Sequence, residues 1–455
     1  MNDPLIPPQV EAAVRRRNLL SVGFGPRFFW IMAVGFVWLI PAWWSPRLIA
    51  AMFIWDACVL AVWVIDLVHL PKPSEFRVSR SFSGPLVIGR PTDVTICIRN
   101  RSGRSVFAHI LDETSTVLRD EPPVFQGGMT HTYEVIPRER GNAEFGGTFV
   151  RYRSELGFAE RWCMAPLAQT VLVYPDLVEA KDHALHLIRS RQQQIEKRQH
   201  RYRGLGREFE SLREYREGDE LRDISWTATA RRRQLVTRTY NVERSQTVWI
   251  VVDAGRLMRA QIRSGELPFT KLDYAVNAAL CVGQVALQYG DRVGLLTYGR
   301  SIRASVAPAR GPQQLRAFVD ALAKVRAEPV EADHARAAST LLHKQTRRSL
   351  IVWITDFAET PAVPDVIEYA AHAGRRHLVL FAAISQPDLA EVAHSVPESE
   401  TAMFRQAAAL EIVDRRDLLL RNLRHTGVLA MDLNPSGFTT SVLNQYLEIK
   451  DRGLL

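Results

Sequence analysis

The stretch VWIVVD, from Val248 to Asp253, consists of five apolar residues followed by one acid. A short apolar run rich in β-branched residues predicts a strand that is buried on both faces of a sheet. Further runs of the same kind follow along the chain, at Arg292–Tyr298, Leu350–Phe357, His377–Ile384 and Gly427–Leu433. These runs indicate that the C-terminal part of the chain is organised around a sheet.

Segments with the helical spacing of apolar residues separate these runs. The expected helices are Thr270–Tyr289, Pro312 to about Lys324, Pro364–Ala373, Glu398–Arg424 and a last one from Gly437, with a short extra strand at Ser301–Val306. Apolar strands that alternate with helices indicate a parallel sheet covered by helices on both faces. We therefore predict a doubly wound α/β domain over residues 246–455.

Upstream of this domain, residues 75–176 show a different pattern. Polar and apolar residues alternate over short runs that are separated by Gly, Pro, Asn and Asp. The expected strands include Thr92–Asn100, Thr130–Ile136, Gly146–Arg153 and Gln169–Pro175. Short alternating strands at this spacing predict a β-sandwich. Its sequence contains no cluster with metal-ligand spacing, so we expect a structural or adhesive role.

Two apolar stretches, Phe28–Trp44 and Leu48–Val68, lie near the N-terminus with three residues between them. Both approach the length of about 20 apolar residues that spans a bilayer, so we predict a transmembrane helical hairpin over residues 28–70. Basic residues flank the hairpin on its outer sides, which places both termini and the large domains in the cytoplasm. We expect a multi-pass protein of the cytoplasmic (inner) membrane, with residues 1–27 as a cytoplasmic tail. A cleaved signal peptide is the alternative, but no small-residue cleavage site follows the first stretch.

Asp56 lies near the middle of the second apolar stretch, and neither stretch contains a Lys or Arg. An acid at this depth in a membrane is a functional candidate by default. The alternative is a protonated carboxyl that hydrogen-bonds across the hairpin or across a dimer interface. We favour this alternative, because two helices cannot enclose a pathway.

Residues 177–245 form a charged linker between the two predicted domains, and its second half is distinctive. The segment GREFESLREYREGDELRDISWTATARRRQLVTRTYNVE closely resembles the signature of a bacterial family known as domain of unknown function number fifty-eight. The matching positions are Glu208, Phe209, Leu212, Arg213, Tyr215, Gly218, Asp219, Arg222, Ile224, Trp226, Ala230, Arg231 and Leu235. The resemblance extends over most of the chain.

The residues of this signature predict a clamp between the two domains. Asp223 is placed to cap a short helix, and Ile224 and Trp226 would anchor that helix through apolar contacts. Arginines of the segment can pair with its acids and dock the linker on the following domain. The alternative is a surface for a partner protein, for which the candidate residues are Arg213, Tyr215, Asp219, Arg222, Trp226 and Arg231.

The resemblance implies a von Willebrand factor A-like fold for the C-terminal domain. Such domains bind Mg²⁺ through an Asp-x-Ser-x-Ser turn, a distant Thr and a further Asp. Asp253 and Asp356 match the two acids, but Gly255 and Leu257 replace the hydroxyls and Ala332 stands near the Thr position. Arg256 adds a cation beside this degenerate site, so we expect neither Mg²⁺ nor any other cofactor. The two acids could instead take part in an internal Asp–Arg pair.

The same resemblance implies partnership with a MoxR-type AAA+ ATPase in the maturation of envelope or other complexes. No G-x-x-x-x-G-K-[ST] loop occurs in this chain, so ATP hydrolysis would come from the partner. We expect an interaction or scaffold protein rather than an enzyme, with homodimerisation left open. A hydrolase is the alternative, but neither Ser225 nor Ser385 lies in a G-x-S-x-G turn.

The net charge of +9 and the pI near 9.5 raise a further alternative, an anionic partner of the basic linker. Acids interleave with the linker arginines and no nucleic-acid reader fold is evident. We therefore expect membrane lipid rather than nucleic acid as the partner of these charges.

Overall fold

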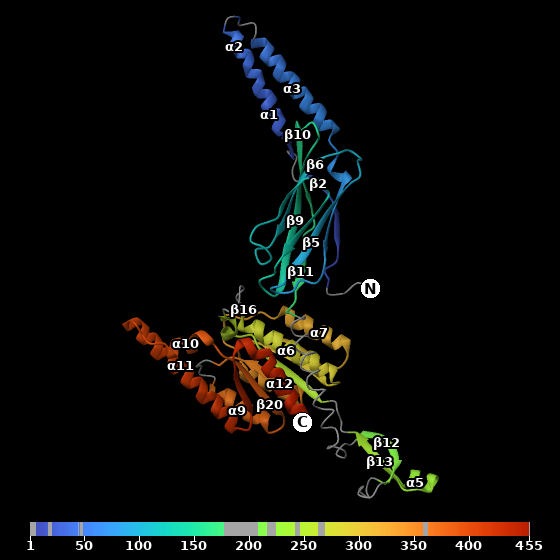
Figure 1. The fold of residues 1–455 in the computed structure, drawn as a ribbon, viewed down its shortest axis with the longest axis vertical. Coiled ribbons are helices and arrows are strands. Elements are labelled where there is room, and N and C mark those ends of the chain that lie inside the picture. The colour runs from blue at the N-terminus through green and yellow to red at the C-terminus, as the bar shows by residue number, and fades with distance from the viewer. Residues whose placement is uncertain are drawn as a thin grey trace. The chain divides into compact units, whose positions relative to one another are not determined.

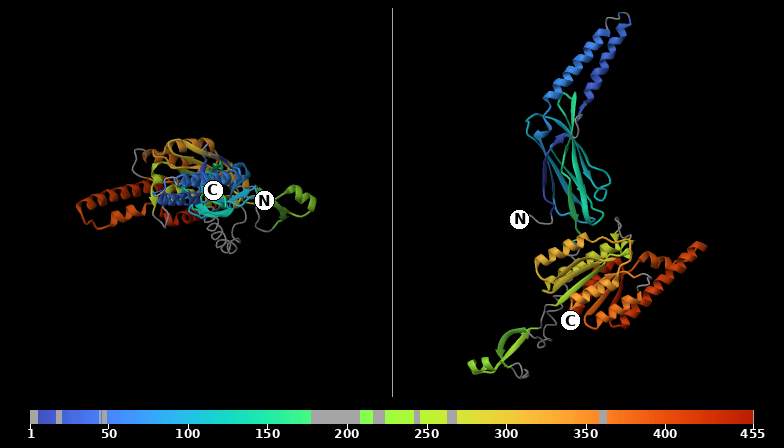
Figure 2. Two further views of the ribbon diagram at one scale, coloured as in Figure 1. Left: turned by 90° about the horizontal axis from the view of Figure 1, so that it is seen from above. Right: turned by 180° about the vertical axis from the view of Figure 1, so that it is seen from behind.

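The computed structural model describes residues 6–16, 21–43, 45, 49–176, 208–215, 224–241, 246–262, 269–357 and 363–454 (Figures 1 and 2). It is a mixed α/β protein with several sheets and an apolar helix near the N-terminus. The chain divides into two compact units, Met1–Tyr174 and Pro175–Leu455.

The second unit contains a six-stranded sheet with the order β18-β17-β14-β19-β20-β21. Its strands are β14 (Thr247–Asp253), β17 (Arg292–Tyr298), β18 (Ile302–Ala309), β19 (Leu350–Thr355), β20 (Leu378–Ile384) and β21 (Leu429–Leu433). Numbered within the sheet, this is the doubly wound order 3-2-1-4-5-6, which reverses direction between β14 and β19.

One strand departs from the predicted parallel arrangement. The edge strand β18 pairs antiparallel with β17, whereas all other neighbours in the sheet are parallel. Only the residues 299–301 connect β17 to β18, and a parallel pair needs a crossover of a dozen or more residues. The short connection therefore forces a hairpin at this edge.

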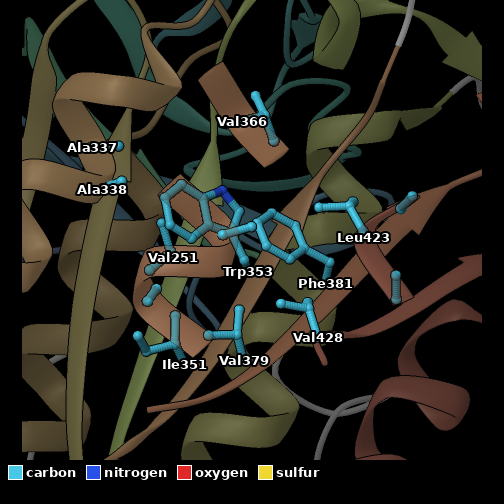
Figure 3. Packing of buried hydrophobic residues seen from close by; sticks show 14 of the residues in the cluster. Val251, Ala337, Ala338, Ile351, Trp353, Val366, Val379, Phe381, Leu423 and Val428 are labelled. Atoms are coloured by element: carbon cyan, nitrogen blue, oxygen red, sulfur yellow. The ribbon is translucent and has the colours of Figure 1, made fainter. Parts of the chain in front are cut away.

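Helices cover both faces of this sheet. They are α6 (Lys271–Gln288), α7 (Pro312–Lys324), α8 (His334–Lys344), α9 (Val363–Gly374), α10 (Pro387–His394), α11 (Glu400–His425) and α12 (Phe438–Asp451). Helices α8, α9 and α11 contribute to one buried cluster, in which Trp353 and Phe381 stack with ring centroids 5.2 Å apart (Figure 3). The helices α8 and α10 were not expected from the sequence.

The first unit contains two antiparallel sheets. One has the order β1-β4-β5-β8, and the other has β2-β10-β9-β6-β7 with β3 and β11 paired to β10 and β9. The strands are β1 (Val10–Ala13), β2 (Arg15–Arg16), β3 (Val22–Phe24), β4 (Phe76–Phe82), β5 (Thr92–Asn100), β6 (Phe107–Thr114), β7 (Val124–Gln126), β8 (Thr130–Val135), β9 (Gly141–Arg153), β10 (Ala159–Ala165) and β11 (Gln169–Val173).

The two sheets contact each other through buried side chains. Phe76 of β4 packs on Tyr152 of β9 with ring centroids 4.6 Å apart. Arg80 of β4 forms an ion pair with Asp112 of β6, and neither side chain is exposed. Tyr133 of β8 also donates a 2.5 Å hydrogen bond to Asp112, so this buried carboxylate of one sheet binds two side chains of the other sheet.

The prediction of an N-terminal tail over residues 1–27 is wrong. Strand β1 pairs with the edge strand β4, and β2 and β3 both pair with β10. An edge strand exposes unpaired N–H and C=O groups, and the N-terminal segment satisfies them here. The sequence pattern missed these strands because each is only two to four residues long.

The two apolar stretches differ in their helical structure. The first folds as α1 (Pro26–Val34), the 3₁₀ helix η1 (Gly35–Trp38) and α2 (Leu39–Ala42), and the second as α3 (Ile49–His69). Within the described residues, only the stretch Ile49–Glu75 is long and apolar enough to cross a membrane as one helix. The expected single helix over the first stretch is therefore replaced by shorter pieces.

Candidate functional site

The candidate site lies at the carboxyl ends of β14 and β19, where the strand order reverses. Ligands of doubly wound sheets bind in the crevice outside this point. Asp253 is the last residue of β14, and Asp356 directly follows β19. Both predicted acids are buried, with 2% and 4% of their surface exposed. The fold therefore brings together two carboxyl groups that are far apart in the sequence.

Asp253 is held by hydrogen-bond donors on both of its oxygens. The backbone N–H of Gly255 donates to Oδ1 over 2.7 Å, and the hydroxyl of Thr355 donates to Oδ2 over 2.7 Å. Burial raises the pKa of Asp253, although nearby His334 and these two hydrogen bonds act in the opposite direction.

Asp356 is bound by two cations. The ammonium of Lys271, at the first position of α6, lies 2.5 Å from Oδ2, and the guanidinium of Arg416 from α11 contacts Oδ1. Arg416 also donates two hydrogen bonds to the carboxylate of Asp432, over 2.8 and 3.1 Å. Burial disfavours the charged guanidinium, but Asp356 and Asp432 outweigh it and raise the pKa of Arg416. The result is a network of two acids and two bases, in which Lys271, Asp356 and Arg416 are largely buried and Asp432 lies at the surface.

This arrangement does not fit a Mg²⁺ site. Both oxygens of Asp356 already bind cationic side chains, and Ala332 lies against Gly255, where a Cβ would come within 2.8 Å of it. The turn after β14 offers no hydroxyl oxygen, whereas Mg²⁺ requires several oxygen ligands. Among the described residues, no group of three or more His, Cys, Asp or Glu side chains is arranged to hold a metal ion.

Arg256 lines the same pocket as Asp253 and Asp356, as expected, but it is not the arginine of the internal Asp–Arg pair. Arg256 faces Glu331 at 3.3 Å on the surface, whereas the internal Asp–Arg pair involves Arg416. Lys271 and Arg416 were not singled out in the sequence, because they lie 85 and 60 residues from Asp356. Only the folded arrangement of α6 and α11 brings them to the same carboxylate.

A cleft of about 570 Å³ opens beside this network. This volume falls within the range of ligand sites in proteins, about 300 to 1,000 Å³. Its polar floor includes Lys271, Asp356, Gln386 and Arg416, and the exposed Arg259 stands at its edge. Its apolar wall is formed by Leu257, Phe357, Leu389, Ala390, Ile412 and Val413. The cleft therefore presents both charged and apolar groups to a ligand.

The family signature forms a small hairpin of its own. Strands β12 (Glu208–Glu214) and β13 (Val236–Asn241) pair antiparallel, and the helix α5 (Trp226–Arg232) lies between them in sequence. The N–H of Tyr215 donates to the carbonyl of Leu235 over 2.9 Å. Arg213 lies in β12 and Arg231 is exposed in the last turn of α5, whereas Asp219, Arg222 and Asp223 lie outside the described residues.

The predicted apolar anchor of this helix is half correct. Ile224 is buried, with 5% of its surface exposed, and it forms an isolated bridge to Thr237. Trp226 is 66% exposed, so the expectation that it anchors α5 is wrong. Trp226 is the first residue of α5 and directly follows the buried Ser225.

Asp56 lies where the helical hairpin packs most closely. A Cβ placed on Gly35 would lie 3.0 Å from Oδ1 of Asp56 and 2.8 Å from the ring of Trp55. The indole N–H of Trp55 donates over 3.0 Å to the carbonyl of Ile31, which lies within α1. Asp56 thus faces the partner helix of the hairpin at a glycine contact.

Comparison with known proteins finds a match to one protein family and similarity to several uncharacterised proteins. Residues 211–421 match the family described as "Protein of unknown function DUF58". The match begins in the signature hairpin and ends within α11, so the hairpin and most of the six-stranded sheet fall within one family unit.

The similar curated proteins are named only as uncharacterised proteins. An uncharacterised protein of Mycobacterium tuberculosis is 30% identical over 156 residues, which are 34% of this chain and 48% of that protein. The uncharacterised protein YeaD of Bacillus subtilis is 27% identical over 133 residues, or 29% of this chain and 32% of that protein. The chain thus matches about half or less of the length of these relatives.

Two solved structures are similar to parts of the chain. The conserved hypothetical protein BatB from Bacteroides thetaiotaomicron has a TM-score of 0.30 and 14% identity, and the match covers 46% of this chain and 100% of BatB. An uncharacterised membrane spanning protein from Vibrio fischeri has a TM-score of 0.16 and 15% identity, covering 45% of this chain and 98% of that protein.

Proposed function

We propose that the protein is a membrane-anchored interaction protein that binds a MoxR-type AAA+ ATPase through its α/β domain. The observation that carries this proposal is the cleft at the reversal point of the sheet. It combines an apolar wall with a buried charge network, and Lys271 and Arg416 neutralise the carboxylates there without a metal. Such a surface suits recognition of a protein segment rather than chemistry on a bound ion.

The strand order supports a von Willebrand factor A-like fold for this domain, a fold used widely for protein recognition. The two facing antiparallel sheets of the first unit support a β-sandwich. Ser385 lines the cleft, but among the described residues it forms no hydrogen bond to a histidine that could act as its base. We therefore favour a non-enzymatic role.

The pairing of the N-terminal strands supports anchoring by a two-helix hairpin. The chain leaves the β domain after β3 and returns to it at β4, so the segment between them enters and leaves a membrane from the same side. This return supports the proposed even number of crossings and the proposed multi-pass topology in the inner membrane.

Affinity capture of the detergent-solubilised full chain would test the proposed partnership. Ile412→Asp places a charge on the apolar wall of the cleft, and Leu418→Asp places the same charge on α11 outside the cleft. We expect the wild type and Leu418→Asp to recover an AAA+ ATPase, and Ile412→Asp to lose it. Equal recovery by both variants would remove the cleft from the interface, and no ATPase with any bait would refute the partnership.

The signature hairpin is a second candidate for the same interface. Trp226→Ala removes an exposed aromatic side chain, and exposed aromatic residues are frequent anchors of protein interfaces. Loss of the ATPase with this variant would place the hairpin in the interface as well. Unchanged recovery would confine the signature to the internal role of a clamp.

A further inference from the structure

The bases of the two apolar helices are fixed to one turn of the β domain, residues 154–158 between β9 and β10. The N–H of Gly25 donates to the carbonyl of Phe158 over 2.7 Å. Two residues later, Arg27 donates from Nη1 to the carbonyls of Glu155 and Leu156 over 3.0 and 3.1 Å. The start of α1 therefore lies directly against this turn.

The end of α3 is fixed to the same turn. Asp66 is 1% exposed and accepts hydrogen bonds from the N–H groups of Phe158 and Ala159 over 3.0 and 2.8 Å. Arg161 donates to the carbonyl of Leu67 over 2.9 Å. Because α3 is 21 residues long and about 20 residues span a bilayer, its last turn lies in the headgroup layer when the helix crosses a membrane. The bound turn then lies in that layer too.

This end of the β domain exposes the side chains that favour a lipid headgroup layer. Leu156 at the turn and Phe107 at the start of β6 are 56% and 52% exposed. Figure 1 shows β10 and β6 ending beside α1 and α3. We call this end the membrane-proximal rim, and it comprises Arg27, Arg101, Arg104, Phe107, Arg153 and Leu156.

The arginines of the rim lack carboxylate partners. Arg104 donates to the carbonyl of His69, and Arg153 lies over the ring of Phe107 with its Cζ 5.8 Å from the centroid. No ion pair is formed by the four rim arginines with any residue that the structure describes. The neighbouring acid Glu160 is occupied by Arg151 at 2.6 Å, and Asp66 is occupied by backbone N–H groups. The four arginines outnumber Glu155, the exposed acid of the turn, so the rim carries an excess of positive charge.

We propose that the membrane-proximal rim is a binding site for the headgroups of anionic phospholipids. The guanidinium groups bind lipid phosphates through paired hydrogen bonds, and Phe107 and Leu156 insert between the headgroups. This inference rests on the proposed membrane anchoring, because the hairpin brings the rim to the bilayer. It assigns lipid binding to the β domain, in addition to the basic linker considered from the sequence.

Spin-labelled lipids in vesicles that contain the full-length protein would test this site. The vesicles are an equimolar mixture of phosphatidylcholine and phosphatidylglycerol, and electron paramagnetic resonance measures how much of each labelled lipid the protein immobilises. We expect a preference of at least about fivefold for phosphatidylglycerol, which is the factor that one surface arginine contributes. The preference should fall as salt is added.

Charge reversal at the rim should abolish this preference. The variant is Arg101→Glu/Arg104→Glu/Arg153→Glu. The neutral variant Arg101→Gln/Arg104→Gln/Arg153→Gln tests whether any loss of preference reflects misfolding. The matched control is Arg90→Glu/Arg119→Glu/Arg138→Glu at the opposite end of the β domain, where Gly89 bonds to Pro137. We expect the preference to vanish in the rim variant, to weaken in the neutral variant and to persist in the control.

The outcomes separate this inference from the proposed anchoring. Flotation of the same vesicles reports whether the protein is anchored at all, and failure to float overturns both the anchoring and the rim. If the protein floats but immobilises both lipids equally, the anchoring stands and the rim inference is wrong. Equal loss of preference in the rim variant and the control would show only a general charge effect, which also overturns the specific site.

Discussion

At the scale of single residues, Arg233 has an unusual backbone conformation. Its φ of 55° lies in the left-handed region, and within the described chain it is the only non-glycine residue with a positive φ. It caps the C-terminus of α5, with its N–H bonded to the carbonyl of Thr229. Glycine is the residue that usually occupies this position, because it lacks the Cβ that clashes there.

We predict that Arg233→Gly stabilises the signature hairpin by about 1 kcal/mol, since it removes this strain. Hydrogen exchange of the β12 and β13 amides in the full chain would measure the effect. Arg232→Gly is the matched control, because Arg232 is still helical and glycine there costs about 1 kcal/mol. A loss of protection in both variants would mean that the Arg233 side chain makes a contact that outweighs the strain.

The Lys271–Asp356 pair makes a second prediction. Its side chains are 2% and 4% exposed, so removing one partner leaves a buried charge with less compensation. We expect Lys271→Met to destabilise the α/β domain by about 3 kcal/mol, the low end for a broken buried pair, because Arg416 still binds Asp356. A thermal melt would measure this loss, with Lys344→Met at an exposed position of α8 as the control. A change below about 1 kcal/mol would show that Arg416 alone balances Asp356.

His377 makes stability depend on pH. Burial lowers its pKa below the ordinary value of 6.5, and neighbouring Arg376 lowers it further. The unfolded chain therefore binds a proton that the native protein excludes, so stability present above pH 6.5 is lost as the pH falls below it. We expect the melting temperature of His377→Gln to fall less steeply with acid than that of the wild type or of His343→Gln. Parallel curves for all three proteins would remove His377 as a source of acid sensitivity.

At the scale of elements, the regular parts of the fold could be predicted and the site only in part. The strand Arg292–Tyr298 and the helix Pro312–Lys324 have the predicted bounds, because apolar periodicity is set by local burial. The acids Asp253 and Asp356 were found through the family resemblance, and they meet because one ends β14 and the other directly follows β19.

The missed features depend on contacts between distant segments. Lys271 and Arg416 lie in helices, and the apolar periodicity of these helices does not predict a contact with Asp356. Both residues reach Asp356 only in the folded domain. The short N-terminal strands pair with edges formed more than 60 residues later. Trp226 was predicted as an anchor because aromatic residues are usually buried, and its exposure reflects the small size of the hairpin.

The joint between α1 and the β9–β10 turn makes the next prediction. A Cβ on Gly25 would lie 2.1 Å from the carbonyl oxygen of Gly157, whereas the nearest atom to a Cβ on Gly23 is 3.7 Å away in Trp162. We expect Gly25→Ala to destabilise the first unit by about 1 to 3 kcal/mol, while Gly23→Ala leaves it nearly unchanged. Thermal unfolding in detergent would compare them. Equal melting temperatures would show that the helix base and the turn separate easily.

At the scale of the whole molecule, the first unit contains both the apolar helices and the strands on either side of them. We predict that deleting residues 2–16, which removes β1 and β2, lowers the melting temperature and causes self-association, because edges of both sheets become exposed. Gel filtration and a thermal melt in detergent would measure this. Deleting only residues 2–6, ahead of β1, is the control. A monodisperse deletion variant of unchanged stability would show that these strands are dispensable.

The return of the chain to β10 has a consequence for biogenesis. Strands β2 and β3 are synthesised early, but their partner β10 leaves the ribosome only after the apolar helices and six further strands. In the proposed membrane topology, β2 and β3 therefore remain unpaired, on the side of the bilayer where translation continues, until β10 has been made. A nascent chain whose N-terminus is carried across the membrane cannot complete its β domain, so folding itself would reject the wrong orientation during synthesis.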